Sequence, residues 1–303
     1  MRALEINTIL NFALVAVLGN TMPILPQTEN PAVRLAQTVL EKQKSRPFWF
    51  RLRSIGFGNL PYVFDVKACV VKYDGKGSEL RQNSSATCPH ATGVFTPIED
   101  VMFYTPITVG NKPVAEKERK AWEQKREEKI SAVKRRSASE KAKIQADEES
   151  NRKERALFWG EFLKAFQFEI VGNKIVNERP TTILSFNPIA NYNPGNGIDT
   201  KYLPKLKGQI WVDDSDLEIA HIEMEFKDDV TAGLGLLGRV YAGTTYFMDL
   251  KKGIDDRWLP AKAETLLRMR QGLVVKTNQR YTYEYDHYRK FTTHVKILET
   301  HPQ

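Results

Sequence analysis

The chain has 303 residues but only two cysteines, Cys69 and Cys88, and five histidines. A structural zinc site needs four ligands at recognisable spacing, and His90 is the only other candidate near the cysteines. The sequence contains no G-x-S-x-G elbow and places no histidine at a spacing that pairs it with a nucleophile. A hydrolase could still assemble its residues from separate strands. The pattern nevertheless favours a protein that is not an enzyme and has no metal and no cofactor.

Long hydrophobic runs are equally scarce. Beyond the N-terminus no stretch of about 18 apolar residues occurs, so the sequence predicts no membrane-spanning body. The apolar run Ile9–Gly19 follows Arg2 and has the length of a signal-peptide core. We therefore expect a signal peptide over residues 1–19, a linker over residues 20–31, and a periplasmic or secreted protein of the cell envelope. A buried N-terminal helix is the alternative interpretation of the same run.

The two cysteines bear on the same question of compartment. After export into an oxidising compartment, Cys69 and Cys88 could close one disulfide-bonded loop. The alternative is a buried Cys69 on a strand and an exposed Cys88 in the turn-like segment Thr87-Cys88-Pro89-His90. The sequence does not decide between the two.

Charge is concentrated in one segment of a chain whose net charge is +8. Residues 112–155 carry fifteen Lys or Arg and ten Asp or Glu, with no glycine. This composition predicts one long solvated helix, inserted at 112–155 into an otherwise globular domain. Its apolar residues are too sparse for a stripe that faces a core, and no heptad repeat is sustained. They are Trp122, Ile130, Val133 and Ile144.

The rest of the chain is typical of an antiparallel β protein. Val33, Ala36, Val39 and Leu40 recur at helical spacing and predict a short helix, and Ala156–Ala165 predicts another. Short turn signals, among them Gly172-Asn173 and Gln271-Gly272, separate the strands and indicate a meander. The predicted strands are 48–55, 62–73, 101–109, 166–171, 181–186, 209–212, 217–226, 240–250, 258–269 and 274–285.

Two motifs that suggest a ligand have simpler explanations. Residues 233–238 have the G-x-G-x-x-G spacing of a dinucleotide-binding loop, but no βαβ unit surrounds them to supply a helix N-terminus. Asp213, Asp214 and Asp216 resemble a cation site, yet they lack the glycine and the distal glutamate of a calcium loop. A hairpin loop and a hairpin turn account for the two segments.

Alternation identifies candidate wall residues of the sheet. Ile222, Met224 and Phe226 face one side of a strand while the intervening glutamates face the other. Near the C-terminus, Tyr281, Tyr283, Tyr285 and His287 are expected on one face of a strand, with Tyr288 on the opposite face. Cross-strand packing is the ordinary role of such aromatic residues, and an aromatic wall on a concave sheet is the alternative.

Three short motifs carry a resemblance to a known series. They are Arg179-Pro180-Thr181-Thr182-Ile183-Leu184-Ser185-Phe186-Asn187-Pro188, then Leu206-Lys207-Gly208-Gln209-Ile210-Trp211-Val212-Asp213, then Arg257-Trp258-Leu259-Pro260. Over residues 160–290 the chain resembles envelope proteins related to the lipoprotein-sorting carrier LolA and its RseB-like relatives, especially members of acidobacterial type. The resemblance implies an α+β, mainly β fold: a curved antiparallel half-barrel sheet covered by helices. Residues 32–303 would then form one LolA-like domain.

The same resemblance implies a function. The concave face of such a sheet would hold lipid or the acyl chains of a lipoprotein, without covalent chemistry. The candidate ligand-binding residues are Ile222, Met224, Phe226, Met248 and Tyr283. The alternative is a structural or interaction protein that docks on an anionic envelope surface or polymer through the helix at 112–155. No nucleic acid is expected, and the sequence fixes neither the ligand's identity nor the oligomeric state.

Overall fold

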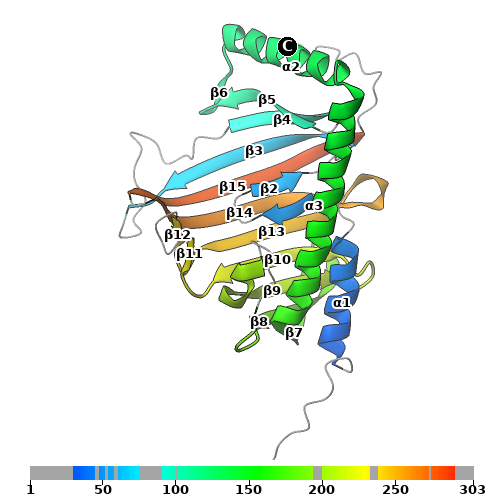
Figure 1. Ribbon diagram of the computed structural model, residues 1–303, viewed down its shortest axis with the longest axis vertical. Helices are drawn as coiled ribbons and strands as arrows, with labels where there is room; N and C mark the ends of the chain where they lie inside the picture. Colours follow the sequence, from blue (N-terminus) through cyan, green and yellow to red (C-terminus); the bar gives the residue numbers. More distant parts are fainter. Residues whose placement is uncertain are drawn as a thin grey trace, which may run out of the picture.

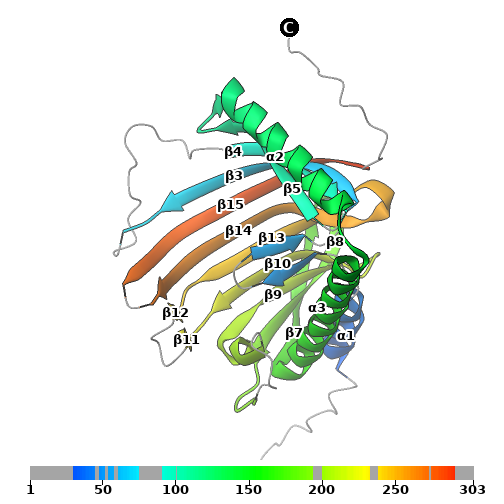
Figure 2. The ribbon, with the colours of Figure 1, turned by 45° about the horizontal axis from the view of Figure 1, so that its top comes forward.

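The protein is dominated by one open antiparallel sheet. The structure is a computed structural model, and it describes residues 30–44, 48–51, 54–57, 61–74, 91–99, 101–193, 200–232, 238–272 and 274–290. Among these residues, thirteen strands form a single curved sheet that does not close into a barrel (Figure 1, Figure 2). The prediction of a mainly β, α+β fold with a curved antiparallel sheet covered by helices is confirmed.

Most of the sheet is a meander. Its order is β6-β5-β4-β3-β15-β14-β13-β10-β9-β8-β7, and every pairing is antiparallel. The N-terminal strands join this meander at its last strand, where β3 pairs with β15. The bounds are β3 Tyr62–Lys72, β4 Ala91–Ile98, β5 Val101–Val109, β6 Lys112–Pro113, β7 Phe166–Val176, β8 Arg179–Pro188, β9 Leu206–Asp213, β10 Ile219–Phe226, β13 Thr245–Lys252, β14 Trp258–Gln271 and β15 Val275–Lys290.

Several strand predictions need correction. The predicted strand 48–55 is a separate hairpin of β1 (Phe48–Arg51) and β2 (Ser54–Phe57), which pair only with each other among the described strands. The predicted strand 240–250 is divided between β12 (Gly238–Val240) and β13, and β12 pairs with β11 (Val230–Ala232) and β14. Strand β4 was missed by the sequence prediction. Gly172-Asn173 is not a turn but lies at a bulge inside β7, whose turn is at Asn177-Glu178.

The charged segment forms two helices rather than one. Helix α2 spans Glu116–Lys134, and helix α3 spans Ala138–Ala165 and absorbs the short helix predicted at 156–165. The break has a sequence cause, because Ser137 and Glu140 form a capping box that starts a new helix. The predicted N-terminal helix is confirmed as α1, Pro31–Gln43, with Asn30 as its N-cap.

Helices α1 and α3 lie side by side against one face of the sheet near β7, and α2 lies across the β5 and β6 end (Figure 1, Figure 2). That face is the concave one. Phe162 of α3 anchors the packing, with its ring centroid 4.5 Å from Phe166 and 5.0 Å from Phe186. No helix among the described residues is long and apolar enough to cross a membrane.

A bulge near the end of β15 reverses the predicted facing of Tyr288. The register shifts between Asp286 and Arg289, and His287 adopts a φ of 51°. Tyr288 therefore lies on the same face as Tyr285, where both rings contact Phe64 at 5.0 and 6.0 Å. His287 lies on the opposite face and contacts Asp65 at 2.9 Å. Simple alternation cannot predict this, because the extra residue of a bulge inverts every later position.

Cys69 on β3 is disulfide-bonded, and no described cysteine is free. Cys88, the only other cysteine of the chain, lies outside the described residues. The disulfide interpretation is therefore confirmed and the free-thiol alternative is wrong. The predicted signal peptide, most of the linker and most of the glycine-rich segment 233–238 also lie outside the described residues, so these predictions stay open.

Candidate functional site

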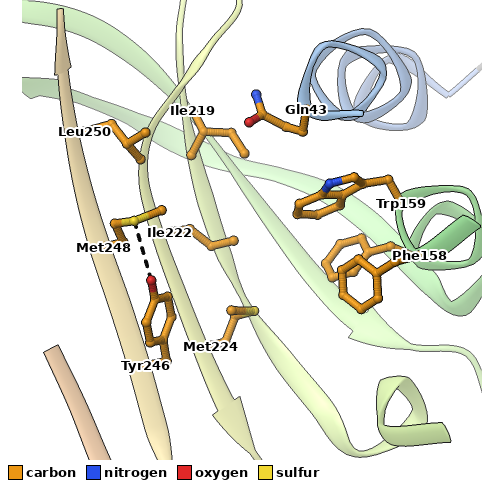
Figure 3. A pocket seen from close by; sticks show the side chains of 10 residues that line it. Gln43, Phe158, Trp159, Ile219, Ile222, Met224, Tyr246, Met248 and Leu250 are labelled. Atoms are coloured by element: carbon orange, nitrogen blue, oxygen red, sulfur yellow. Dashed lines mark hydrogen bonds between the residues drawn. The ribbon is translucent and has the colours of Figure 1, made fainter. Parts of the chain in front are cut away.

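An apolar cavity lies between the sheet and the two covering helices. Its sheet wall comes from β10 and β13, and its helix wall comes from α1 and α3 (Figure 3). The cavity is small and measures about 30 Å³. The residues that line it are Gln43, Phe158, Trp159, Phe162, Ile219, Ile222, Met224, Tyr246, Met248 and Leu250.

Strand register creates the sheet wall. Ile222 pairs with Met248 and Met224 pairs with Tyr246, so alternate residues of both strands point to the same side. The Tyr246 hydroxyl donates to the Met248 sulfur at 3.4 Å, as Figure 3 shows. Burial raises the pKa of Tyr246 far above its ordinary value, so this phenol stays neutral at physiological pH. The wall is therefore uncharged.

The helix wall is aromatic and has one amide. Phe158 and Trp159 project from α3 toward Met224 and Ile222, and their ring centroids are 5.2 Å apart (Figure 3). Gln43, at the end of α1, is buried and donates to the Glu218 carboxylate at 3.3 Å. Beside it, Lys42 Nζ donates to the Asp216 carbonyl at 2.6 Å. These contacts hold α1 to the turn that precedes β10.

The structure brings together three of the five predicted site residues. Ile222, Met224 and Met248 line the cavity. Phe226 is buried on the same face of β10 but lies beyond the cavity, opposite Leu206. Tyr283 is half-buried on β15, outside the lining, with its ring 6.3 Å from Tyr285. Ligand binding by all five residues stays a prediction.

Sequence reasoning missed most of the cavity's walls. Tyr246 and Leu250 share the alternation of Met248 and could have been named with it. Phe158, Trp159 and Phe162 recur at the spacing of one helix face, but nothing local indicates which strands they cover. Gln43 carried no signal, because a glutamine at the end of a helix is ordinarily solvated.

The cavity offers shape and apolar surface rather than reactive groups. None of its ten lining residues is an acid, a histidine or a lysine. His221 contacts Asp249 at 2.5 Å and Glu223 at 2.9 Å, but it lies on the other face of β10 from Ile222. Within the described ranges, no group of three or more His, Cys, Asp or Glu could hold a metal ion. The site fits an apolar ligand held by burial.

No family model matches the chain, and no curated protein matches its sequence. Among solved structures it is similar to a DUF1329 family protein from Desulfovibrio piger, at 8% identity and a TM-score of 0.28, over 86% of this chain and 91% of that one. It is also similar to the LolA superfamily protein of Nitrosomonas europaea, at 10% identity and a TM-score of 0.26, over 85% of this chain and 94% of that one. A third similar structure is a candidate outer membrane lipoprotein-sorting protein domain from Vibrio parahaemolyticus. It shares 8% identity and a TM-score of 0.29, over 88% of this chain and 94% of that one.

The second and third of these structures bear names from the series that the sequence motifs resemble. At such identities and TM-scores they carry no inference about this chain's ligand. Membership of the LolA and RseB-like series, and of its acidobacterial type, stays a prediction.

Proposed function

We propose that the protein is a non-enzymatic binding protein of the cell envelope that holds lipid, or the acyl chains of a lipoprotein, between the concave face of its sheet and helices α1 and α3. The observation that carries this proposal is the cavity beneath Trp159, whose walls are almost entirely apolar. Burial of an acyl chain is favourable by roughly 0.8 kcal/mol for each methylene removed from water. No reactive group is needed for such a function.

An acyl chain needs more room than about 30 Å³, so binding requires one wall to move. The sheet wall is fixed by the backbone hydrogen bonds of β10 and β13 with their neighbours. The helix wall is held mainly by side chains, chiefly Trp159 and Phe162 of α3 and Gln43 of α1. Among the described residues, backbone fixes α3 only at its end, where the Ile189 N–H donates to the Ala165 carbonyl at 2.8 Å. The helices are therefore the wall that moves. Met224 and Met248 suit this role, because unbranched thioether side chains adapt to irregular ligands.

Export follows from the same proposal. A protein that holds lipid for the envelope must leave the cytoplasm, and the run Ile9–Gly19 has the length of a signal-peptide core. The disulfide of Cys69 supports an oxidising compartment. N-terminal sequencing of the protein from its native cells should find a mature chain that begins near residue 20. A mature chain that retains Met1 would contradict export by cleavage.

The alternative function, docking through the segment 112–155, has less support. Arg119 of α2 is paired with Glu116 at 2.8 Å and with Glu123 at 2.7 Å, and Lys153 of α3 is paired with Glu149 at 3.1 Å. Such pairs within a helix stabilise it by a few tenths of a kcal/mol and offset its positive charge locally. Part of the positive charge of the segment is therefore offset within the helices themselves.

The first test is native mass spectrometry of protein purified from its own envelope fraction, followed by organic extraction of whatever is bound. A co-purifying lipid or acylated protein is the expected result. The delipidated protein should also bind a fluorescent fatty acid. Met224→Glu would place a charge on the cavity wall and should abolish this binding, whereas Glu225→Gln, one residue away on the opposite face, should leave it unchanged. A lipid-free native mass together with no fatty-acid binding would overturn the proposal.

A further inference from the structure

The β14–β15 hairpin extends past the rest of the meander. Strand β13 begins at Thr245, opposite Leu266, so the last residues of β14 pair only with β15 and with the short strand β12. This end of the sheet lies away from α3 in both ribbon views (Figure 1, Figure 2). The surface that it presents is therefore clear of the covering helices.

Basic residues stand in a row across these three strands. Arg239 of β12 is directly opposite Arg270 of β14, and Arg270 is directly opposite Lys276 of β15. Ala263 of β14 pairs with Met248 and therefore faces the cavity. Arg270 is an odd number of residues further along the same strand, so it faces the opposite, outer side of the sheet. Its two partners in the row share that face. Arg268 and Arg280 lie on the same face nearby. We call these five residues the basic row.

This arrangement is unfavourable for folding alone. Directly opposed side chains of an antiparallel pair lie about 5 Å apart, and like charges at that separation repel. Two acids offset part of the charge, since Asp229 contacts Arg239 at 2.5 Å and Glu264 contacts Arg280 at 3.4 Å. Five basic residues against these two acids leave this surface positively charged. A binding role for an anionic surface explains why such a row is present.

The turn beside the basic row is apolar. Val274, in the turn next to the start of β15, is 82% exposed. Val275, the first residue of β15, is 61% exposed and lies opposite Gln271, on the face of the sheet away from the basic row. A soluble polyanion would gain nothing from two exposed valines. A bilayer surface suits both features, because apolar tips can enter the boundary between headgroups and acyl chains while Arg and Lys contact anionic headgroups.

We propose that the β14–β15 end of the sheet docks on an anionic lipid bilayer, with Val274 and Val275 at the boundary and the basic row on the headgroups. This docking does not depend on the cavity and does not involve the segment 112–155. It would place the protein at a membrane with α1 and α3 directed away from the lipid.

The test is cosedimentation of the full chain with vesicles of phosphatidylcholine containing about a third phosphatidylglycerol, and with vesicles of phosphatidylcholine alone. We expect binding to the anionic vesicles that weakens as salt is raised. Replacing Arg270 and Lys276 together with Gln should reduce the affinity roughly thirtyfold. The matched control replaces Lys141 and Lys143 of α3 with Gln, which removes the same charge elsewhere and should leave the affinity within about twofold. Val274→Ser should weaken binding to vesicles but not to soluble polyphosphate.

Equal loss in the two double variants would overturn the proposal, because only net charge would then matter. Equal binding to neutral vesicles would overturn it as well. Tight binding to polyphosphate with no effect of Val274→Ser on vesicle binding would assign the basic row to a soluble polyanion instead. Circular dichroism of each variant verifies folding, and all substituted side chains are at least partly exposed.

Discussion

Arg179 donates from Nε and from a terminal nitrogen to the two carboxylate oxygens of Asp213, at 2.6 and 2.8 Å, and the Asp213 side chain is fully buried. The same guanidinium lies over the ring of Trp258, 5.6 Å from its centroid. Strands β8, β9 and β14 meet at this point. Each of the three sequence motifs that resemble the known series contributes one residue to this contact. Together they form a structural cluster of polar side chains on the sheet beside α1.

Replacement of Asp213 should destabilise the protein. Asp213→Asn removes the charge that pairs with Arg179 and disturbs a carboxylate that also accepts from the backbone N–H groups of residues 215 and 216. Loss of hydrogen bonds to a buried charged group should lower the free energy of unfolding by about 2 kcal/mol. Urea denaturation measures this. Asp214→Asn, at the exposed neighbour, is the control and should change stability by less than about 0.5 kcal/mol. Equal stability of the two variants would contradict the role of the pair.

Acid should weaken the same cluster. Burial alone would raise the pKa of Asp213, but the Arg179 guanidinium and the backbone N–H of Asp216 outweigh it and hold the pKa below 3.8. Lys252, and then the Trp258 indole, lower the pKa of Asp216. Because both pKa values fall on folding, the stabilisation is complete above about pH 5 and is lost as the pH falls through the folded-state values.

Thermal unfolding followed between neutral pH and about pH 3 tests this. The Tm should hold steady at mildly acidic pH and then drop. Asp213→Asn should be less sensitive to acid than the parent protein over the same interval. A parent Tm that does not change on acidification, or a variant with an identical profile, would refute the assignment.

Gly208 on β9 should not tolerate alanine. A Cβ at this position would lie 2.0 Å from the Glu223 carbonyl oxygen and 2.5 Å from Phe186 Cζ. One of these contacts is backbone, so the strand itself would have to shift, and we expect a loss of about 2 kcal/mol or more. Gly160→Ala in α3 is the control, because nothing lies within 4 Å and alanine favours a helix by roughly 0.5 to 1 kcal/mol. Denaturant unfolding should therefore show a lower free energy of unfolding for Gly208→Ala and a higher one for Gly160→Ala than for the parent protein. A Gly208→Ala variant as stable as the parent would contradict the packing at β9.

Reduction of the disulfide should lower stability. The bond of Cys69 closes a loop to the only other cysteine of the chain, and a loop of this order of length contributes about 3 kcal/mol. The Tm should fall when a reductant is added. The Tm of the double variant Cys69→Ser, Cys88→Ser should equal that of the reduced protein and should not change when the reductant is added. Two thiols that titrate in the native oxidised protein would show that the bond does not form.

Local patterns predicted the elements that depend on neighbouring residues. Helical spacing located α1, and strand alternation placed Ile222 and Met224 on one face of β10. The break between α2 and α3 was also readable, since Ser137 and Glu140 have capping-box spacing. The prediction of one helix nevertheless missed this break. Other features that were missed had no local signal. The bulge at His287, which moves Tyr288 to the inner face, depends on how β15 pairs with β3, a strand more than 200 positions earlier.

By itself the sequence determined the class of fold, the antiparallel meander and the charged helical segment, because periodicity and short turns act within a few residues. Only the tertiary structure decided which surfaces face each other. It set Trp159 of α3 over Met224 and Ile222, and it aligned Arg239, Arg270 and Lys276 in one row. Both arrangements depend on strand register and on helix packing across long sequence separations, where burial of apolar area and complete backbone hydrogen bonding select one alignment among many.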